Sequence, residues 1–320
     1  MTVSVIGAGA FGTALAQSHA ADGRDVTIWA RSEDTVLAIN SLHENTSRLA
    51  GVSLSPALRA TSSLREATQA DKILMCLPMQ KLGQFLRENK TLLQGKTLIG
   101  CCKGIELESL SGTSALLKKC APDSVPAILT GPGFARDIAG GLPTAMTLAC
   151  ADKTAPALQQ ELSTSVVRLY LTDDMIGAEL GGALKNVVAI ACGAVIGAGL
   201  GESARAAIMT RGFSEMQRLA VHLGANPETL TGLSGFGDLT LTCSSDQSRN
   251  YKYGFDVGAG KIPDPKITTE GVATARAVAH LAKNAGVDLP LTQTVAALTL
   301  GEITLAEAAE GLLSRPLRKE

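Results

Sequence analysis

The sequence lacks an excess of charge of either sign. Its 320 residues include 29 lysines and arginines and 30 aspartates and glutamates, for a formal net charge of -1. Such a chain has no long-range field to attract nucleic acid or an anionic membrane surface. We therefore expect neither as a partner, and any anionic ligand must be held by local donors.

Three further patterns are missing. The seven cysteines include no CxxC pair, and several lie in apolar runs, so we expect reduced, mostly buried thiols and no metal site. No leader-like pattern precedes the first strand-like run, residues 3–6, and we expect a cytoplasmic protein. The longest apolar stretch, residues 187–200, is broken by three glycines and is shorter than the roughly 20 residues of a membrane span. This stretch predicts a buried core helix and no membrane span.

The composition is that of a globular α/β protein with more than one domain. A hydrophobic fraction of 45% can fill a sizeable core, and 320 residues exceed the usual size of one domain. Short apolar runs alternate with amphipathic stretches up to about residue 170, which is typical of βαβ units on a parallel sheet. The predicted strands are residues 3–6, 25–29, 73–77, 97–101, 127–130, 144–148 and 166–171. We expect a dinucleotide-binding Rossmann-type domain over residues 1–172, followed by an all-helical substrate-binding and catalytic domain over residues 173–320.

The first predicted strand runs into a glycine-rich turn, residues 7–12, with the sequence GAGAFG. In a dinucleotide-binding turn, the first glycine (Gly7) permits the tight turn and the second (Gly9) lets the backbone approach a pyrophosphate. The third (Gly12) allows the helix to pack on the strand. The next helix would direct its N-terminal amides at the phosphates. A purely structural glycine turn is the alternative, but the position between strand and helix favours the cofactor site.

The end of the second predicted strand bears on the choice of cofactor. NAD-binding proteins usually carry Asp or Glu there, bonded to the ribose hydroxyl. This chain has Trp29-Ala30-Arg31 instead. Because this position holds no carboxylate that could repel a 2′-phosphate, and because Arg31 could bind one, we predict a preference for NADP, with NAD as a second cofactor. A solvated loop charge is the alternative reading of Arg31.

One lysine, Lys185, interrupts the most apolar helical stretch of the second half. Small residues dominate its own helix face, so another backbone or a ligand can come close to it. Desolvation there would favour the neutral amine, as a general base requires, and a lysine that snorkels at a helix edge is the alternative. The small residues of that face are Ala178, Gly181, Gly182, Ala189 and Cys192. The four histidines lie away from other polar motif residues, and we assign none of them to catalysis.

Further polar residues follow Lys185 in the sequence. Asp238 lies in a glycine-flanked turn, where it could cap a helix or orient Lys185 and a substrate hydroxyl. The run Ser248-Arg249-Asn250 suits a phosphate, although the serine could equally be a helix cap.

Two first-domain loops, residues 103–106 and 131–135, follow predicted strands. In an open parallel sheet ligands bind at these strand ends, so both loops would border the nicotinamide. Taken alone, each of these loops is more typical of an ordinary turn.

Taken in order, these motifs resemble the NAD(P)-dependent glycerol-3-phosphate dehydrogenases of the bacterial type, and the similarity runs nearly end to end. The matching segments are GAGAFGTALA from Gly7, KGIE from Lys103, GPGFA from Gly131, ELGGALKN from Glu179, TRGFSEM from Thr210, GFGDLTLTC from Gly235, SRN from Ser248 and EGVATA from Glu270. The resemblance implies reversible reduction of dihydroxyacetone phosphate to sn-glycerol 3-phosphate, which feeds glycerophospholipid synthesis. It also implies Lys185 as the proton donor or acceptor.

The resemblance further implies two sets of ligand contacts, with Lys103 and Arg249 shared between them. Substrate would be surrounded by Lys103, Gly131, Gly133, Lys185, Asp238, Ser248, Arg249 and Asn250, with Lys103 and Asp238 assisting Lys185 in catalysis. The cofactor would contact Gly7, Gly9, Ala10, Phe11, Gly12, Arg31, Lys103, Ala135, Arg249, Thr268 and Glu270.

The sequence departs from the family pattern at a few positions. Gly133 replaces the usual Ser or Thr, so only backbone can contact substrate there. At Thr268 a bulkier aliphatic residue is usual, and residues 194–203 also differ. None of these departures touches Lys185.

Two rival functions are open. A β-hydroxyacid or ketopantoate type reductase also joins a Rossmann domain to a helical one with a lysine, but the phosphate-binding SRN segment argues against it. A non-catalytic NADP-binding redox sensor would leave the lysine unexplained. Helices that are apolar on more than one face make a homodimer our expectation.

Overall fold

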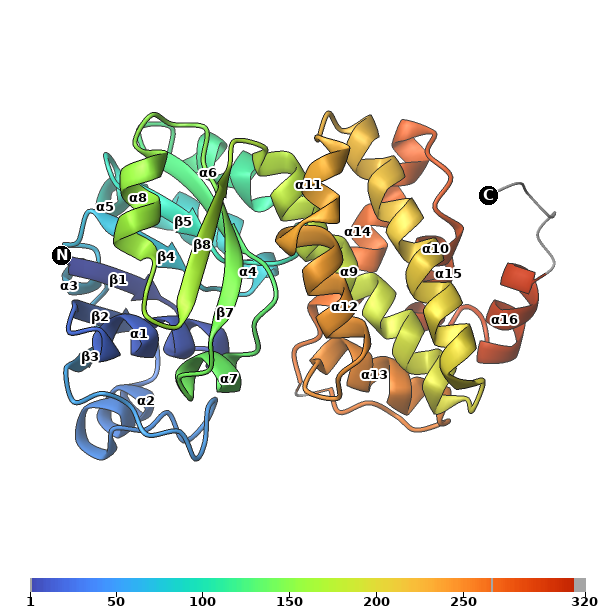
Figure 1. Cartoon of the computed structure of the whole chain (residues 1–320), viewed down its shortest axis with the longest axis horizontal. Coiled ribbons are helices and arrows are strands. Elements are labelled where there is room, and N and C mark those ends of the chain that lie inside the picture. The colour runs from blue at the N-terminus through green and yellow to red at the C-terminus, as the bar shows by residue number, and fades with distance from the viewer. Residues whose placement is uncertain (1, 266, 314–320) are drawn as a thin grey trace. The chain divides into compact units, whose positions relative to one another are not determined.

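The computed structural model describes residues 2–265 and 267–313, and the chain divides into two compact units (Figure 1). The first unit runs to Lys103 and resumes over Ser111–Glu179, and the second comprises Gly104–Leu110 and the residues from Leu180 on. The last strand ends at Thr172, the residue at which the sequence pattern changes. The first unit extends further because the first turn of the next helix packs on its sheet.

The first unit is built on an eight-stranded sheet with the order β3-β2-β1-β4-β5-β6-β7-β8. The strands are β1 Thr2–Ile6, β2 Asp25–Trp29, β3 Leu58–Thr61, β4 Lys72–Met75, β5 Thr97–Gly100, β6 Val125–Thr130, β7 Thr144–Ala149 and β8 Val167–Thr172. The first six strands follow the Rossmann order and pair in parallel, which confirms the predicted fold. Every predicted strand is present, with ends shifted by two residues at most.

The sheet differs from the predicted one in two respects. Strand β7 runs antiparallel to β6, and β8 pairs in parallel with β7. Strand β3 was not predicted, because it is a four-residue edge strand with the charged Arg59 at its second position. Such a short segment has too few residues to display a clear alternation of apolar and polar side chains.

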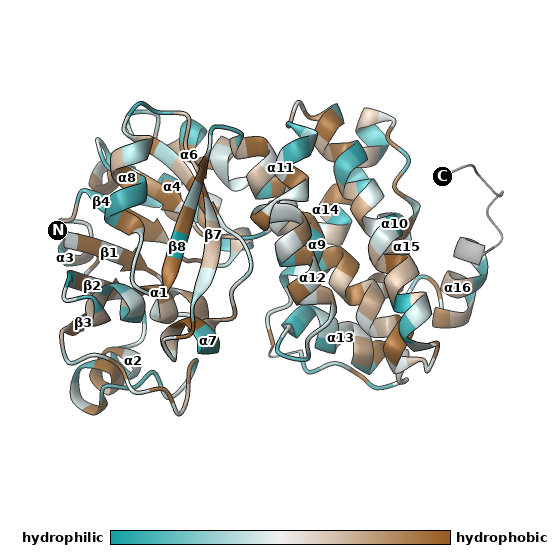
Figure 2. Ribbon diagram, viewed as in Figure 1, coloured by the Kyte–Doolittle hydropathy of each residue, from teal (hydrophilic) through white to brown (hydrophobic). Residues whose placement is uncertain are grey.

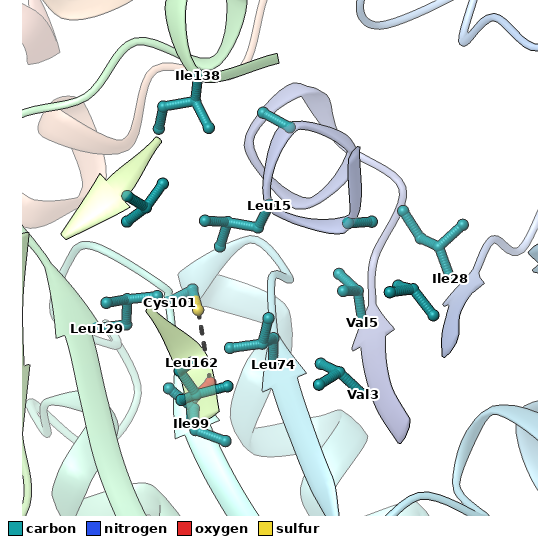
Figure 3. Close-up of a cluster of buried hydrophobic side chains, with 14 of the residues drawn as sticks. Val3, Val5, Leu15, Ile28, Leu74, Ile99, Cys101, Leu129, Ile138 and Leu162 are labelled. Atoms are coloured by element: carbon teal, nitrogen blue, oxygen red, sulfur yellow. Dashed lines mark hydrogen bonds between the residues drawn. The ribbon is translucent and has the colours of Figure 1, made fainter. Parts of the chain in front are cut away.

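Side chains that alternate along the central strands form two apolar layers. Val5 and Leu74 point to one face of the sheet, and Ile6 and Ile73 belong to the cluster on the other. Figure 3 shows part of the first cluster, which includes Val3 and Val5 of β1 and Leu15 of helix α1 (Ala10–Ala21). Helices cover both faces because parallel strands need crossover connections.

The helices of the first unit are mostly short. They are α1 Ala10–Ala21, α2 Glu33–Leu37, the π-helical turn η1 Ala38–Leu42, α3 Leu64–Ala67, α4 Met79–Glu88, α5 Lys90–Leu93, α6 Thr113–Cys120, α7 Ala135–Ala139 and α8 Ala155–Leu162.

Every secondary-structure element described in the second unit is helical, as predicted. Its elements are α9 Met175–Gly197, α10 Gly201–His222, α11 Pro227–Thr231, the π-helical turn η2 Leu233–Gly237, α12 Asp238–Cys243, α13 Arg249–Gly258, α14 Glu270–Ala285, α15 Pro290–Leu300 and α16 Leu305–Leu313. Helix α9 is long and apolar enough to cross a membrane, but 83% of its most apolar segment is buried inside the protein. The predicted core helix is thus confirmed, and Figure 2 shows the apolar residues along it.

Candidate active site

The glycine turn has the backbone that a pyrophosphate site requires. Gly7 has φ +114°, and a side chain there would place Cβ 2.5 Å from the carbonyl oxygen of Cys76. A Cβ on Gly12 would lie 2.1 Å from the carbonyl oxygen of Gly7. A Cβ on Gly9 would meet nothing within 4 Å, so the space over the second glycine is open. Each glycine therefore fits the place that the dinucleotide turn assigns to it.

The turn also lies where a Rossmann sheet binds its ligand. It follows β1, which pairs with β2 on one side and β4 on the other, so the strand order reverses at this point. Helix α1 begins directly after Gly9 and directs its first-turn amides toward the turn. The residues present thus fit the phosphates of a dinucleotide.

Three predicted ligand contacts come together beside the turn. The ammonium of Lys103 donates to the carbonyl oxygen of Gly131 at 3.0 Å. The same ammonium lies 5.7 Å from the centre of the Phe11 ring. A cation over an aromatic face is attracted by the ring quadrupole, which helps to orient the lysine. Ala135, a further predicted contact, is the first residue of α7.

The structure explains the unusual glycine in the loop after β6. A Cβ on Gly133 would lie 2.9 Å from the Cδ1 atom of Ile138. Ile138 is buried in the core of the unit, so it already occupies the space beside the glycine. A serine or threonine at this position would require the isoleucine to move.

In the second unit, Lys185 is buried and directly paired with Asp238. The lysine side chain is 8% exposed and that of the aspartate 1% exposed. The Lys185 ammonium donates to Oδ1 of Asp238 and, at 2.8 Å, to Oγ1 of Thr242. Asp238 thus lies in direct contact with the lysine, and the lysine does not snorkel to the surface. Asp238 is also the first residue of α12.

This pair changes the expected charge of the lysine. Burial alone favours the neutral amine, but a carboxylate at contact distance favours the ammonium. A buried carboxylate without its cation is strongly unfavourable, so the two charges stabilise each other. The pair therefore holds an ammonium, a proton donor, at a fixed position.

A second partner of the lysine, Thr242, was missed by the sequence analysis. Thr242 is four residues after Asp238 on the same helix, so both side chains lie on one face of α12. Its hydroxyl is 3.5 Å from Oδ1 of Asp238. The signal that could have found it was this i, i+4 spacing of two polar residues in an apolar run.

Close backbone packing brings α9 next to the segment that carries Asp238. A Cβ on Gly181 would lie 2.4 Å from the carbonyl oxygen of Ser234 in η2. The glycine on the lysine face of α9 therefore allows a neighbouring backbone to approach, as predicted.

The Ser248–Asn250 segment forms the start of helix α13. The Ser248 hydroxyl caps this helix by accepting from the Tyr251 amide at 3.2 Å. The Asn250 amide donates to Oδ1 of Asn186 and accepts from the Gly271 amide, both at 2.9 Å. These bonds tie α13 to the residue after Lys185 and to the start of α14.

Glycines on both helices set the position of α13 against α9. A Cβ on Gly193 would lie 2.0 Å from the Tyr251 carbonyl oxygen, and one on Gly254 would lie 1.9 Å from the Ile190 carbonyl oxygen. Gly197 and Gly258 repeat the pattern one turn further on. The glycines that interrupt the apolar stretch thus permit a very close helix pair.

The remaining predicted contacts lie nearer the surface. Arg31 and Arg249 are exposed, and so is Thr268 in the segment before α14. Glu270 is half-buried and begins α14 beside Gly271.

Comparison with known proteins covers almost the whole chain. Residues 2–156 match the family described as NAD-dependent glycerol-3-phosphate dehydrogenase N-terminus, and residues 174–310 match its C-terminus. The chain is 57% identical to glycerol-3-phosphate dehydrogenase [NAD(P)+] of Ruegeria sp. (strain TM1040), with 100% of each chain covered. It belongs to this dehydrogenase family. The members named are oxidoreductases that use a nicotinamide cofactor.

Solved structures agree with this assignment. Glycerol-3-phosphate dehydrogenase from Coxiella burnetii has a TM-score of 0.93 at 32% identity, and the match covers 98% of this chain and 99% of that one. A ketopantoate reductase from Ralstonia eutropha has a TM-score of 0.60 at 15% identity, over 98% of this chain and 100% of that one. At that identity the likeness extends to the fold alone.

Proposed function

We propose that this chain catalyses the reversible NAD(P)-dependent reduction of dihydroxyacetone phosphate to sn-glycerol 3-phosphate, for glycerophospholipid synthesis. The observation that carries the proposal is the buried Lys185–Asp238 pair in a protein of this family. Reduction of a carbonyl needs a proton at the oxygen, and a positioned ammonium can supply it. The first unit would bind the dinucleotide, and the second would bind and protonate the substrate.

Lys185 acts as the acid in the reduction direction. Its ammonium polarises the substrate oxygen and transfers a proton to it as the oxygen becomes negatively charged. Asp238 and Thr242 hold the nitrogen in place throughout. In the oxidation direction the neutral amine takes the hydroxyl proton back. When bound, the nicotinamide supplies or accepts the hydride.

The substrate phosphate would be held by the start of α13. Arg249 is exposed and bears a guanidinium suited to a phosphate, and it stands beside the capped end of the helix. Ser248 and Asn250 fix that end through their own hydrogen bonds. Lys103, with the backbone of Gly131 and Gly133, would complete the substrate contacts.

The cofactor would lie on the glycine turn, with NADP preferred over NAD. The support for this preference is Arg31, which is exposed just after β2 where NAD-specific proteins carry a carboxylate. The proposed contacts are Gly7, Gly9, Ala10, Phe11, Gly12, Arg31, Lys103, Ala135, Arg249, Thr268 and Glu270. Arg31→Glu should shift the ratio of kcat/KM values toward NADH, and an unchanged ratio would remove Arg31 from the assignment.

Replacement of the lysine tests the catalytic assignment. Lys185→Ala should lower kcat by a factor of about 10² to 10⁴, the usual cost of losing a positioned acid or base. Its affinity for NADPH, measured by fluorescence titration, should stay near that of the wild-type protein. Lys81→Ala in α4 serves as a matched control, because it removes a lysine outside the proposed site. Near-native turnover by Lys185→Ala would disprove the role of the lysine.

A substrate comparison tests the reaction itself. Oxidation of NADPH should be rapid with dihydroxyacetone phosphate and slow with ketopantoate or a short oxo acid. Preference for an oxo acid would favour the reductase with the related fold. Binding of NADPH without turnover of any phosphorylated ketone would instead indicate a redox sensor.

We further propose that the chain acts as a cytoplasmic homodimer. Several helices of the second unit bear exposed apolar side chains, among them Val221 of α10 and Leu300 of α15. Light scattering at micromolar concentration should report twice the mass of one chain, and a monomer mass would exclude the dimer.

A further inference from the structure

A buried asparagine contacts the glycine turn from a distant part of the sequence. Asn45 follows the π-helical turn η1 and is only 1% exposed. Its side-chain Nδ2 donates to the carbonyl oxygen of Ala8 at 3.0 Å and to Oγ1 of Thr13 at 2.8 Å. One amide group therefore joins the turn to the first part of α1.

The other end of this side chain is engaged by its own loop. Oδ1 of Asn45 accepts from the Arg48 amide and from the Ser47 hydroxyl, each at 3.2 Å. Donors thus face the turn and the acceptor faces the loop, and the neighbouring groups determine this orientation. A flipped amide would place oxygen against the Ala8 carbonyl, so a single orientation satisfies both ends.

The bond to Ala8 also sets the direction of the next amide. In a trans peptide the C=O and the following N–H point to opposite sides. Because Asn45 holds the Ala8 carbonyl on its own side, the amide of Gly9 is directed away from Asn45. Thr13 strengthens the arrangement, since its amide donates to the Gly9 carbonyl at 2.9 Å.

We propose that Asn45 is a positioning residue for the cofactor turn. It keeps the Ala8–Gly9 peptide and the start of α1 in the conformation that offers amides to a pyrophosphate. This inference rests on the proposed role of the turn as the cofactor site. A preformed turn loses less entropy when the ligand binds, so Asn45 contributes to cofactor affinity without touching the cofactor.

The inference can be tested by measuring the binding of two ligands, NADPH, which has a pyrophosphate, and adenosine 2′-phosphate, which has none. Asn45→Ala removes the two donated bonds, and Asn45→Asp keeps the acceptor for the 47–48 loop while it loses the donor. We expect both variants to bind NADPH roughly tenfold more weakly by calorimetry, since the partly buried Ala8 carbonyl loses its donor. Affinity for adenosine 2′-phosphate, which has no pyrophosphate, should be unchanged. The KM for NADPH should rise while kcat at saturation stays the same.

Asn40 offers a matched control in the same unit. Its side chain donates to the Ala60 carbonyl at 2.9 Å and accepts from the Ala60 amide at 2.8 Å. Asn40 is an exposed residue, and Asn40→Ala removes a comparable pair of side-chain hydrogen bonds that hold β3 instead of the turn. It should lower thermal stability without a selective loss of NADPH affinity.

The outcomes separate the two proposals. If the wild-type protein does not bind NADPH, the cofactor site itself is wrong. If it binds NADPH but the Asn45 variants lose no more affinity than Asn40→Ala, or lose equal affinity for adenosine 2′-phosphate, the positioning role is wrong. Should Asn45→Ala fail to fold, the near-isosteric Asn45→Asp decides by the same comparison.

Discussion

The stability of the first unit should depend on pH through one buried histidine. His19 in α1 is 2% exposed, and its Nδ1 lies 2.7 Å from the Nη1 atom of Arg24. The same guanidinium donates to the carbonyls of Glu161 and Ser163, which hold it in place. Burial first, and the neighbouring guanidinium second, lower the pKa of His19 from 6.5 to about 4.

The sign of the effect follows from the two states. Between pH 6.5 and about 4, the unfolded chain binds a proton at His19 and the folded unit does not. The stability due to the neutral histidine is therefore fully present above pH 6.5 and is lost as the pH falls. At about 1.4 kcal/mol for each pKa unit, the loss between pH 7.5 and pH 5 is about 2 kcal/mol.

Urea unfolding can measure this loss within the first unit. Trp29, the single tryptophan of the chain, lies in β2 of that unit, so its fluorescence reports the same unfolding step. In His19→Asn the amide oxygen can still accept from Arg24, but the residue does not titrate. The free energy of unfolding of the wild-type protein should fall by about 2 kcal/mol more than that of the variant between pH 7.5 and pH 5. His280→Asn, at an exposed histidine of α14, should behave like the wild-type protein. Parallel pH dependence in the wild-type protein and His19→Asn would refute the reasoning.

Further predictions concern the second unit. Glu215 accepts from the Leu291 amide at 2.6 Å, and burial raises the pKa of this carboxyl, so the folded state takes up its proton first as the pH falls. The wild-type protein should therefore gain stability relative to Glu215→Gln from pH 7 to pH 5 by calorimetry, and an equal response of both would contradict this. Gly181→Ala should push η2 away from α9 and so displace Asp238. We expect kcat to fall roughly tenfold or more, with little change in the affinity for NADPH. An unchanged kcat would show that the close contact between α9 and η2 is not needed. Gly254→Val should cost about 3 kcal/mol or more in thermal unfolding, because its side chain would collide with a backbone carbonyl of α9, and a loss under about 1 kcal/mol would contradict the close packing.

Much of the site could be predicted from the sequence because its parts are local. The strand, the glycine turn and the following helix are neighbours in the chain, and only glycine tolerates the φ of +114° at Gly7. Lys185 was recognisable because it is the single lysine in an apolar helix and lies on a face of small residues. Asp238 was a candidate either as a helix cap or as the partner of Lys185, and only its contact with the lysine in the structure distinguished the two roles.

Other features depend on contacts between distant residues. The direction of β7, the pairing of the edge strand β3 and the contact of Asn45 with the turn all join segments that no short-range pattern connects. The sequence by itself thus determined seven of the strands, the glycine turn and the apolar helix that Lys185 interrupts, because backbone sterics and hydrophobic periodicity act over a few residues. Only the tertiary structure decided which groups hold that turn and that lysine in place, because a buried hydrogen bond or ion pair needs a partner that folding brings near.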